Sequence, residues 1–306
     1  MRAFWIVFAV VIAAPLWGQT RTFEVVDRQG FDEQIVAMTM EIPETWKATR
    51  EVLWSKLCSG NPLYEITLTI SSPDGLTGAR MLPGHQIIWS HHEMAGDPGM
   101  AQLWQSQQEA ERNRLRTEFQ GSNCYLAPLR DAQVLFRNLV LAKRPADTQV
   151  TSTKPIQPVL DSYKQIFAQP APGSQVFFDA NTHEMNYKMG NTPITERVNF
   201  SWYMFQTETR DPGYYMLTQR TIVDPIQIDW FPVARAQTAI ATLDQIGKSI
   251  RYKEDWQKKV TEVREKRAKK TKEENEKIAR ERKRELKDRE RRSDKRHRDF
   301  LRQIWQ

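Results

Sequence analysis

The densest group of side chains that could do chemistry lies around His91 and Glu93, six residues after His85. Histidine nitrogens and carboxylate oxygens are common ligands of Zn²⁺. Alternate residues of a β-strand face the same side, so His91 and Glu93 would share one face. A third ligand would have to come from Asp97 or His183 through the fold. The simpler interpretation, exposed polar residues at a strand end, predicts no metal and no other cofactor.

The rest of the sequence contains no pattern typical of nucleophilic or phosphate chemistry. It has neither the G-x-S-x-G elbow of serine hydrolases nor a glycine-rich loop that could cradle a phosphate. We therefore predict a protein that is not an enzyme. The alternative, a metal-assisted hydrolase of the cell envelope, would use His85, His91 and Glu93.

Cys58 and Cys124 are the only cysteines of the chain. Neither belongs to a C-x-x-C motif, which argues against a redox or zinc role. In an oxidising compartment the two can form a disulfide, and closing a loop of this length would contribute about 4 kcal/mol in the chain-entropy model. Two separate buried thiols are the alternative, and the sequence leaves both open.

The first residues, MRAFWIVFAVVIAAPLWGQT, have one cation at Arg2, an apolar run from Ala3 to Ala14, and then Pro15. This layout is typical of a secretory signal peptide, which we place at residues 1–18. The apolar run is shorter than the about 20 residues of a comfortable membrane span. We therefore expect a periplasmic or secreted protein. The alternative is an uncleaved N-terminal anchor, which would make the chain a structural protein of the membrane surface.

The positive charge of the chain is concentrated at its C-terminal end. Of the 45 Lys and Arg residues, 23 lie from Arg251 onward, together with 13 of the 38 Asp and Glu residues. Residues 251–306 therefore carry a net charge of +10, and residues 1–250 a net charge of −3. A nearly neutral domain has no electrostatic footprint for nucleic acid, which is disfavoured as a partner.

Residues 251–306 contain no Pro or Gly and predict a long, basic, solvated helical arm. Pairs such as Glu273 with Lys277 have the i,i+4 spacing that stabilises an exposed helix by about 0.2–0.5 kcal/mol each. No sustained heptad of apolar residues supports a stable coiled coil. Basic runs such as KRAKK at 266–270 predict binding to lipid headgroups, a cell-wall polymer or an acidic protein. The last apolar residues form a candidate tip that either docks on a partner or folds back on the domain: Phe300, Leu301, Ile304 and Trp305.

Residues 19–250 predict one α+β domain in which antiparallel sheets pack with helices. The first part is typical of an antiparallel meander. Within it, residues 64–70 alternate so that Ile66, Leu68 and Ile70 would face the core and Glu65 the solvent.

A helical insert is expected at about residues 100–169. It comprises a polar surface helix at Met100–Phe119, an amphipathic helix at Asp131–Arg144 with Val134 and Leu135 on its core face, and a further helix after a proline-containing connection.

A second antiparallel region follows Gly173, with turns at Asn181, at residues 190–191 and at residues 211–213. Val198, Phe200, Trp202 and Met204 alternate and would face one way. The domain would close with an amphipathic helix within Phe231–Ile250.

The segment Gln34–Trp89 contains an amphipathic strand ending in EIPETW, a return strand, the turn LTISSPDG and a hairpin. The closing helix contains TAIATLDQIGKSIRY. These features, which cover Gln34–Trp89 and Phe231–Tyr252, resemble the PsbP-like fold, including exported bacterial proteins of that class. The resemblance implies a PsbP-like sandwich and a non-catalytic role in binding or assembly. The resemblance assigns no catalytic residue to this chain. The helical middle of the chain, about residues 100–169, is longer than expected for this fold, and the charged arm has no counterpart in it.

The sequence thus predicts an exported, non-catalytic binding or assembly protein of the cell envelope. We expect a protein partner in the envelope. The basic arm would tether the chain to an anionic surface or dock on that partner.

Overall fold

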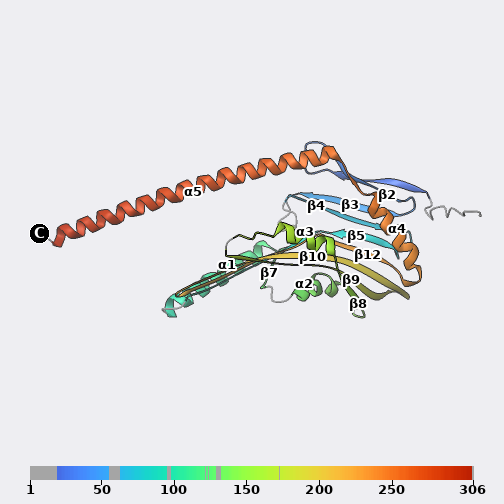
Figure 1. The fold of residues 1–306 in the computed structure, drawn as a ribbon, viewed down its shortest axis with the longest axis horizontal. Helices are drawn as coiled ribbons and strands as arrows, with labels where there is room; N and C mark the ends of the chain where they lie inside the picture. Colours follow the sequence, from blue (N-terminus) through green and yellow to red (C-terminus); the bar gives the residue numbers. More distant parts are fainter. Residues whose placement is uncertain are drawn as a thin grey trace, which may run out of the picture. The chain divides into compact units, whose positions relative to one another are not determined.

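The computed structural model describes residues 19–54, 63–94, 98–120, 122, 124–128, 132–171 and 173–304 (Figure 1). The described chain is α+β and divides into two compact units after Arg251. The first unit holds the sheets, and the second is built on one long helix. The predicted α+β class and the long C-terminal helix are confirmed.

The smaller sheet has three strands in the order β1–β2–β13: β1 (Thr20–Asp27), β2 (Ile35–Pro43) and β13 (Arg251–Tyr252). The closing helix α4 (Ala236–Ser249) packs on β2. There the backbone N–H of Glu41 donates a 2.9 Å hydrogen bond to Ser249 Oγ. This contact fixes the end of α4 to the smaller sheet.

The larger sheet has ten strands, of which eight follow the order β3–β4–β5–β12–β10–β11–β6–β7, while β9 pairs with β10 and β8 pairs with β9. The strands have these bounds: β3 (Lys47–Trp54), β4 (Tyr64–Ser71), β5 (Gly78–Leu82), β6 (His85–Met94), β7 (Cys124–Leu126), β8 (Gln149–Pro155), β9 (Ser174–Met189), β10 (Thr192–Asp211), β11 (Tyr214–Val223) and β12 (Ile226–Pro232). β6 and β7 pair in parallel, and the other pairs described are antiparallel.

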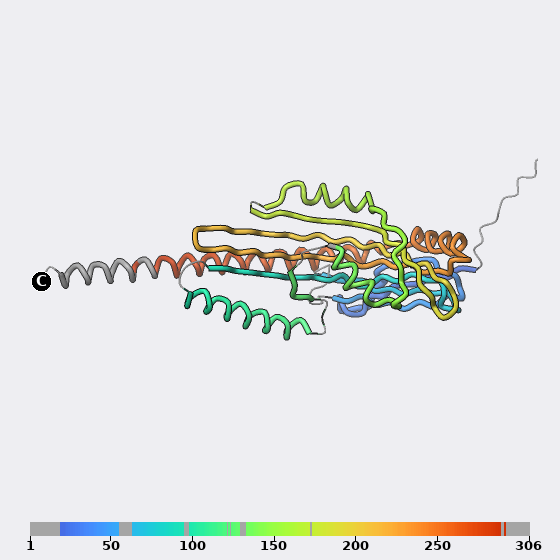
Figure 2. Tube along the Cα trace, turned by 90° about the horizontal axis from the view of Figure 1, so that it is seen from below, coloured from blue at the N-terminus to red at the C-terminus, as the bar shows by residue number. Residues whose placement is uncertain are grey.

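The 20-residue strand β10 organises the larger sheet. One of its edges pairs with β9 from Thr192 to Thr207. The other edge pairs first with β12, over residues 194–199, and then with β11, from Trp202 to Asp211. Because two successive strands share one edge, the β10–β11 hairpin extends as a long ribbon, and β6 pairs with β11 along it (Figure 2).

The β10–β11 hairpin closes in a two-residue turn at Pro212 and Gly213, because Asp211 pairs with Tyr214. Gly213 has a φ of +85°, a conformation that residues with a side chain rarely adopt. The ring of Pro212, the first residue of the turn, restricts the φ of that residue to about −65°. The turn expected from the sequence is therefore confirmed, with its physical cause in these two residues.

The two faces of β10 are covered by different helices (Figure 1). On one face, even-numbered side chains are buried in the core with α2 (Ala132–Leu139): Val198, Phe200, Trp202 and Met204. On the other face, Tyr203 lies against Tyr163 of α3 (Gln157–Ile166), with ring centroids 5.6 Å apart. The predicted alternation of β10 is confirmed.

Residues 100–169 supply more than helices. α1 (Pro98–Glu118) buries no side chain, as expected of a polar surface helix. The same region also adds β7 and β8 to the larger sheet, although β8 was expected to be an irregular connection. With β8 on one edge and β10 on the other, β9 continues through Asn181, so the predicted turn at that residue is wrong.

Two predicted burial positions also differ from the structure. Leu135 is buried as predicted, but Val134 is 38% exposed, because α2 buries Phe136 in its place. α2 ends at Leu139, before the short 3-10 turn η1 (Leu141–Lys143). Glu65 was expected to face solvent but is 2% exposed. Its carboxylate accepts a 2.8 Å hydrogen bond from the backbone N–H of Gly84. This hydrogen bond offsets part of the free-energy cost of burying the carboxylate.

The second unit contains α5 (Glu254–Ile304), a helix of 51 residues. Its buried side chains, among those described, are Trp256 and Val260, at 1% and 4% exposure. Every residue from Arg264 to Asp288 is exposed. The predicted solvated helix is confirmed.

Within the described residues, no helix is both long and apolar enough to cross a membrane. The predicted signal peptide at residues 1–18 lies outside the described residues.

Candidate functional site

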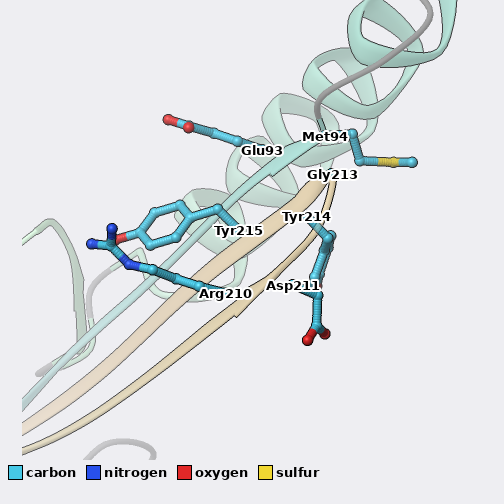
Figure 3. Close-up of a pocket in the computed structure, with 7 residues that line it drawn as sticks. All are labelled: Glu93, Met94, Arg210, Asp211, Gly213, Tyr214 and Tyr215. Carbon is cyan, nitrogen blue, oxygen red and sulfur yellow. The ribbon is translucent and has the colours of Figure 1, made fainter.

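His91 and Glu93 lie towards the far end of the β6–β11–β10 ribbon, where an open pocket of about 490 Å³ is found (Figure 3). Seven residues line this pocket and are here called the tip surface: Glu93, Met94, Arg210, Asp211, Gly213, Tyr214 and Tyr215. In Figure 3, the side chains of Glu93, Arg210 and Tyr215 project from one side of the ribbon.

The tip surface combines a cation with aromatic rings. Arg210 Cζ lies 5.2 Å from the centroid of the Tyr215 ring, which is within cation–π range. Its guanidinium also contacts Glu208 at 2.5 Å, and this carboxylate raises the pKa of Arg210. His91 Nε2 lies 2.8 Å from Glu93 Oε1. Arginine and tyrosine are enriched at protein interfaces, so the tip surface is suited to a protein partner.

His85, the other candidate ligand, does not lie near His91. It is 6% exposed and its ring centroid lies 5.6 Å from that of Tyr125. His91 follows His85 by six positions along the strand, which corresponds to about 20 Å. In the part of the chain that the structure describes, no three His, Cys, Asp or Glu side chains are grouped as a metal site would require. Asp97 lies outside that part.

α1 lies along the outer edge of β6 and bonds to its backbone (Figure 2). Gln108 Nε2 donates to the carbonyl of His92 at 2.6 Å, and Gln108 Oε1 accepts from the N–H of His92 at 3.0 Å. Arg112 donates to the carbonyl of Ser90 at 3.1 Å and lies 4.3 Å from the centroid of the Trp89 ring. These contacts give hydrogen-bond partners to backbone groups at the edge of β6, which would otherwise be open to pairing with another strand.

A second pocket, here called the α2 cavity, lies between α2 and the larger sheet. Its volume is about 410 Å³. Eleven residues from α2, η1, β8, β9 and β10 line it: Gln133, Phe136, Arg137, Leu141, Val150, Thr153, Asp179, Asn181, His183, Phe200 and Trp202. The size falls within the range of small-ligand sites, about 300–1,000 Å³.

His183, which the sequence offered only as a remote third metal ligand, belongs to the α2 cavity. Its ring stacks on Phe136, with centroids 3.8 Å apart, and its Nδ1 lies 3.0 Å from Thr153 Oγ1. Burial lowers the pKa of His183, against a smaller opposing effect of the Asp179 carboxylate. The imidazole is therefore neutral at pH 7.

Cys124 is 5% exposed and carries no free thiol. Cys58 lies outside the described residues, so the pairing of these two cysteines stays a prediction. The candidate docking tip also stays a prediction. Trp305 lies outside the described residues, and the side chains of Phe300, Leu301 and Ile304 are not described either.

The sequence matches no protein-family model and no curated protein. The function must therefore be inferred from the charges and the geometry of the chain itself.

The α2 cavity was missed from the sequence because its walls come from five separate elements. A weak signal was present in β9, where Asp179, Asn181 and His183 alternate in the sequence. Alternate positions of a strand share one face, so these three residues form a polar row on one side of β9.

Proposed function

We propose that this protein is an exported, non-catalytic binding or assembly protein of the cell envelope, in which α5 attaches the chain to an anionic surface. One observation carries the proposal: residues 251–306 have a net charge of +10 on a helix that is exposed from Arg264 to Asp288. Each Lys or Arg near an anionic lipid surface contributes about 1 kcal/mol.

Two ion pairs within α5 are loose, so Lys258 and Lys270 can exchange their partners for such a surface. Lys270 Nζ lies 3.9 Å from Glu274 Oε1, and Lys258 Nζ lies 4.0 Å from Asp255 Oδ1. Exposed pairs of this kind contribute about 0–1 kcal/mol and exchange readily with other partners.

The first unit would supply the protein-binding function. The tip surface, with Arg210 beside Tyr215, offers a suitable patch. The resemblance of residues 34–89 and 231–252 to PsbP-like domains supports the same role, since that resemblance implies binding or assembly rather than catalysis. A periplasmic or secreted location is part of this proposal.

The proposal is tested by sedimenting the full chain with lipid vesicles. Vesicles of phosphatidylcholine alone are compared with vesicles that also contain phosphatidylglycerol, at low and high salt. We expect binding only to the anionic vesicles and its loss at high salt, because exposed charges are screened over about 10 Å at 0.1 M ionic strength.

A parallel arm uses purified cell-wall sacculi to distinguish an anionic polymer from lipid as the source of negative charge. Binding to sacculi but not to vesicles would assign the polymer. Equal binding to neutral and anionic vesicles, or no binding to any of these surfaces, would contradict the proposed role of α5.

A further inference from the structure

The α2 cavity has one polar wall and one apolar wall. The polar wall is the row Asp179, Asn181 and His183 on β9, at alternate positions about 7 Å apart. Phe136 of α2 and Leu141 of η1 belong to the apolar side. This combination suits a ligand that has both hydrogen-bonding groups and an apolar face.

The polar wall is fixed by hydrogen bonds among its own members. Asp179 Oδ2 accepts from Asn181 Nδ2 at 2.7 Å, and Asp179 Oδ1 accepts from the N–H of Ala180 at 2.9 Å. Each carboxylate oxygen can still accept a second hydrogen bond. The wall is thus preorganised, which reduces the entropic cost of binding.

His183 adds a neutral group to this wall. Phe136 stacks on its ring and Thr153 engages Nδ1, so Nε2 is the nitrogen left for a ligand. Because burial lowers the pKa of His183, the ring offers a donor or an acceptor there, depending on its tautomer, but no positive charge.

The lining of the cavity carries no net charge. Asp179 contributes one carboxylate in the polar wall, and Arg137, an exposed residue of α2, contributes one guanidinium. A lining without net charge favours neither an anion nor a cation, which suits a neutral ligand. Hydroxyl groups can donate to Asp179 and Asn181 and accept from His183.

We propose that the α2 cavity binds a small neutral carbohydrate. The hydroxyl groups of the sugar bond to Asp179, Asn181 and His183, and its C–H face lies against the apolar side of the cavity at Leu141. This site is independent of α5 and does not require the anionic surface proposed above.

The test measures sugar binding to the full chain by saturation-transfer NMR, followed by titration calorimetry. The probes are glucose, galactose, mannose, N-acetylglucosamine and their disaccharides, with glucuronate as the anionic counterpart of glucose. Two variants address the cavity: Asn181→Ala removes a polar group, and Gln133→Trp fills space from an exposed position on α2. Asn186→Ala is the matched control, because Asn186 lies on the opposite face of the same strand and is exposed.

We expect at least one neutral sugar to bind the wild-type chain, and glucuronate to bind more weakly than glucose. Asn181→Ala should weaken binding roughly tenfold through lost hydrogen bonds. Gln133→Trp should abolish binding, and Asn186→Ala should leave it unchanged.

The proposal is overturned if no neutral sugar binds, if glucuronate binds more tightly than glucose, or if binding survives in both cavity variants. Thermal unfolding of each variant checks its fold. Since Gln133 is exposed, Gln133→Trp keeps the test decisive even if Asn181→Ala unfolds.

Discussion

The side-chain amide of Gln108 bonds to both backbone groups of His92, at 2.6 and 3.0 Å, as a neighbouring strand would. β7 pairs only with Gln86–Ile88 of β6. Beyond those residues, α1 takes the place of a strand. This role explains how a helix that buries no side chain can still be part of the fold.

Replacing Gln108 by Ala should destabilise α1 and expose the edge of β6. Two buried or half-buried backbone groups of His92 lose their partner, which costs about 1–3 kcal/mol. Chemical unfolding measures this loss, and light scattering measures the association that an open edge promotes. Gln107→Ala is the control, because Gln107 is exposed on the same helix. Equal behaviour of the two variants would contradict the pairing role.

Breaking the ion pair between Arg144 and Glu196 should cost far more stability than breaking a surface ion pair. Arg144 Nε lies 2.7 Å from Glu196 Oε1, and the Glu196 side chain is only 4% exposed. Tyr187 donates a second hydrogen bond, 2.9 Å, to the same carboxylate. Arg144→Met leaves a buried carboxylate without its cation, so we expect a loss of about 3–5 kcal/mol in the free energy of unfolding.

The matched control for this pair is Arg235→Met. Arg235 Nη2 lies 3.0 Å from Asp74 Oδ2, but both side chains are exposed, so we expect a change of about 0–1 kcal/mol. Thermal denaturation of both variants provides the comparison. If Arg144→Met lowers the free energy of unfolding no more than Arg235→Met does, burial of the Glu196 carboxylate does not determine the cost of breaking its ion pair.

His183 should make the stability of the first unit depend on pH. Burial lowers its pKa in the folded state, so the unfolded chain takes up a proton more readily as the pH falls below about 6.5. Folding stability should therefore decrease from neutral to mildly acidic pH. His183→Asn should reduce this decrease, while Thr153→Ser, which keeps the hydroxyl partner, should retain it. If stability depends on pH identically in His183→Asn and the wild type, the pH dependence does not come from His183.

Local periodicity predicted much of the fold. The alternation of Val198, Phe200 and Trp202 and the turn at Gly213 follow from strand geometry and glycine conformation, and both are confirmed. The absence of Pro and Gly after Arg251 indicated the long helix α5.

Other features depend on contacts between distant segments, which periodicity does not reveal. β8 is exposed along almost its whole length, so it lacks the apolar alternation of a strand and exists because β9 offers an edge. Glu65 is buried because Gly84 supplies a donor. The α2 cavity likewise requires α2, β8 and β9 to meet.

The central claim, attachment through the charge of α5, is tested most directly by changing that charge within one stretch of the helix. In one variant, Lys266, Arg267, Lys269 and Lys270 become Gln. In the control, Glu273, Glu274 and Glu276 become Gln. All seven residues are exposed, so neither change should disturb a core.

Binding to vesicles that contain phosphatidylglycerol is then measured for both variants and the wild type at low salt. We expect the first variant to lose up to about 4 kcal/mol of binding free energy, at about 1 kcal/mol per cation, and the second to bind more tightly than the wild type. Indistinguishable affinities of all three proteins would contradict the attachment role of α5.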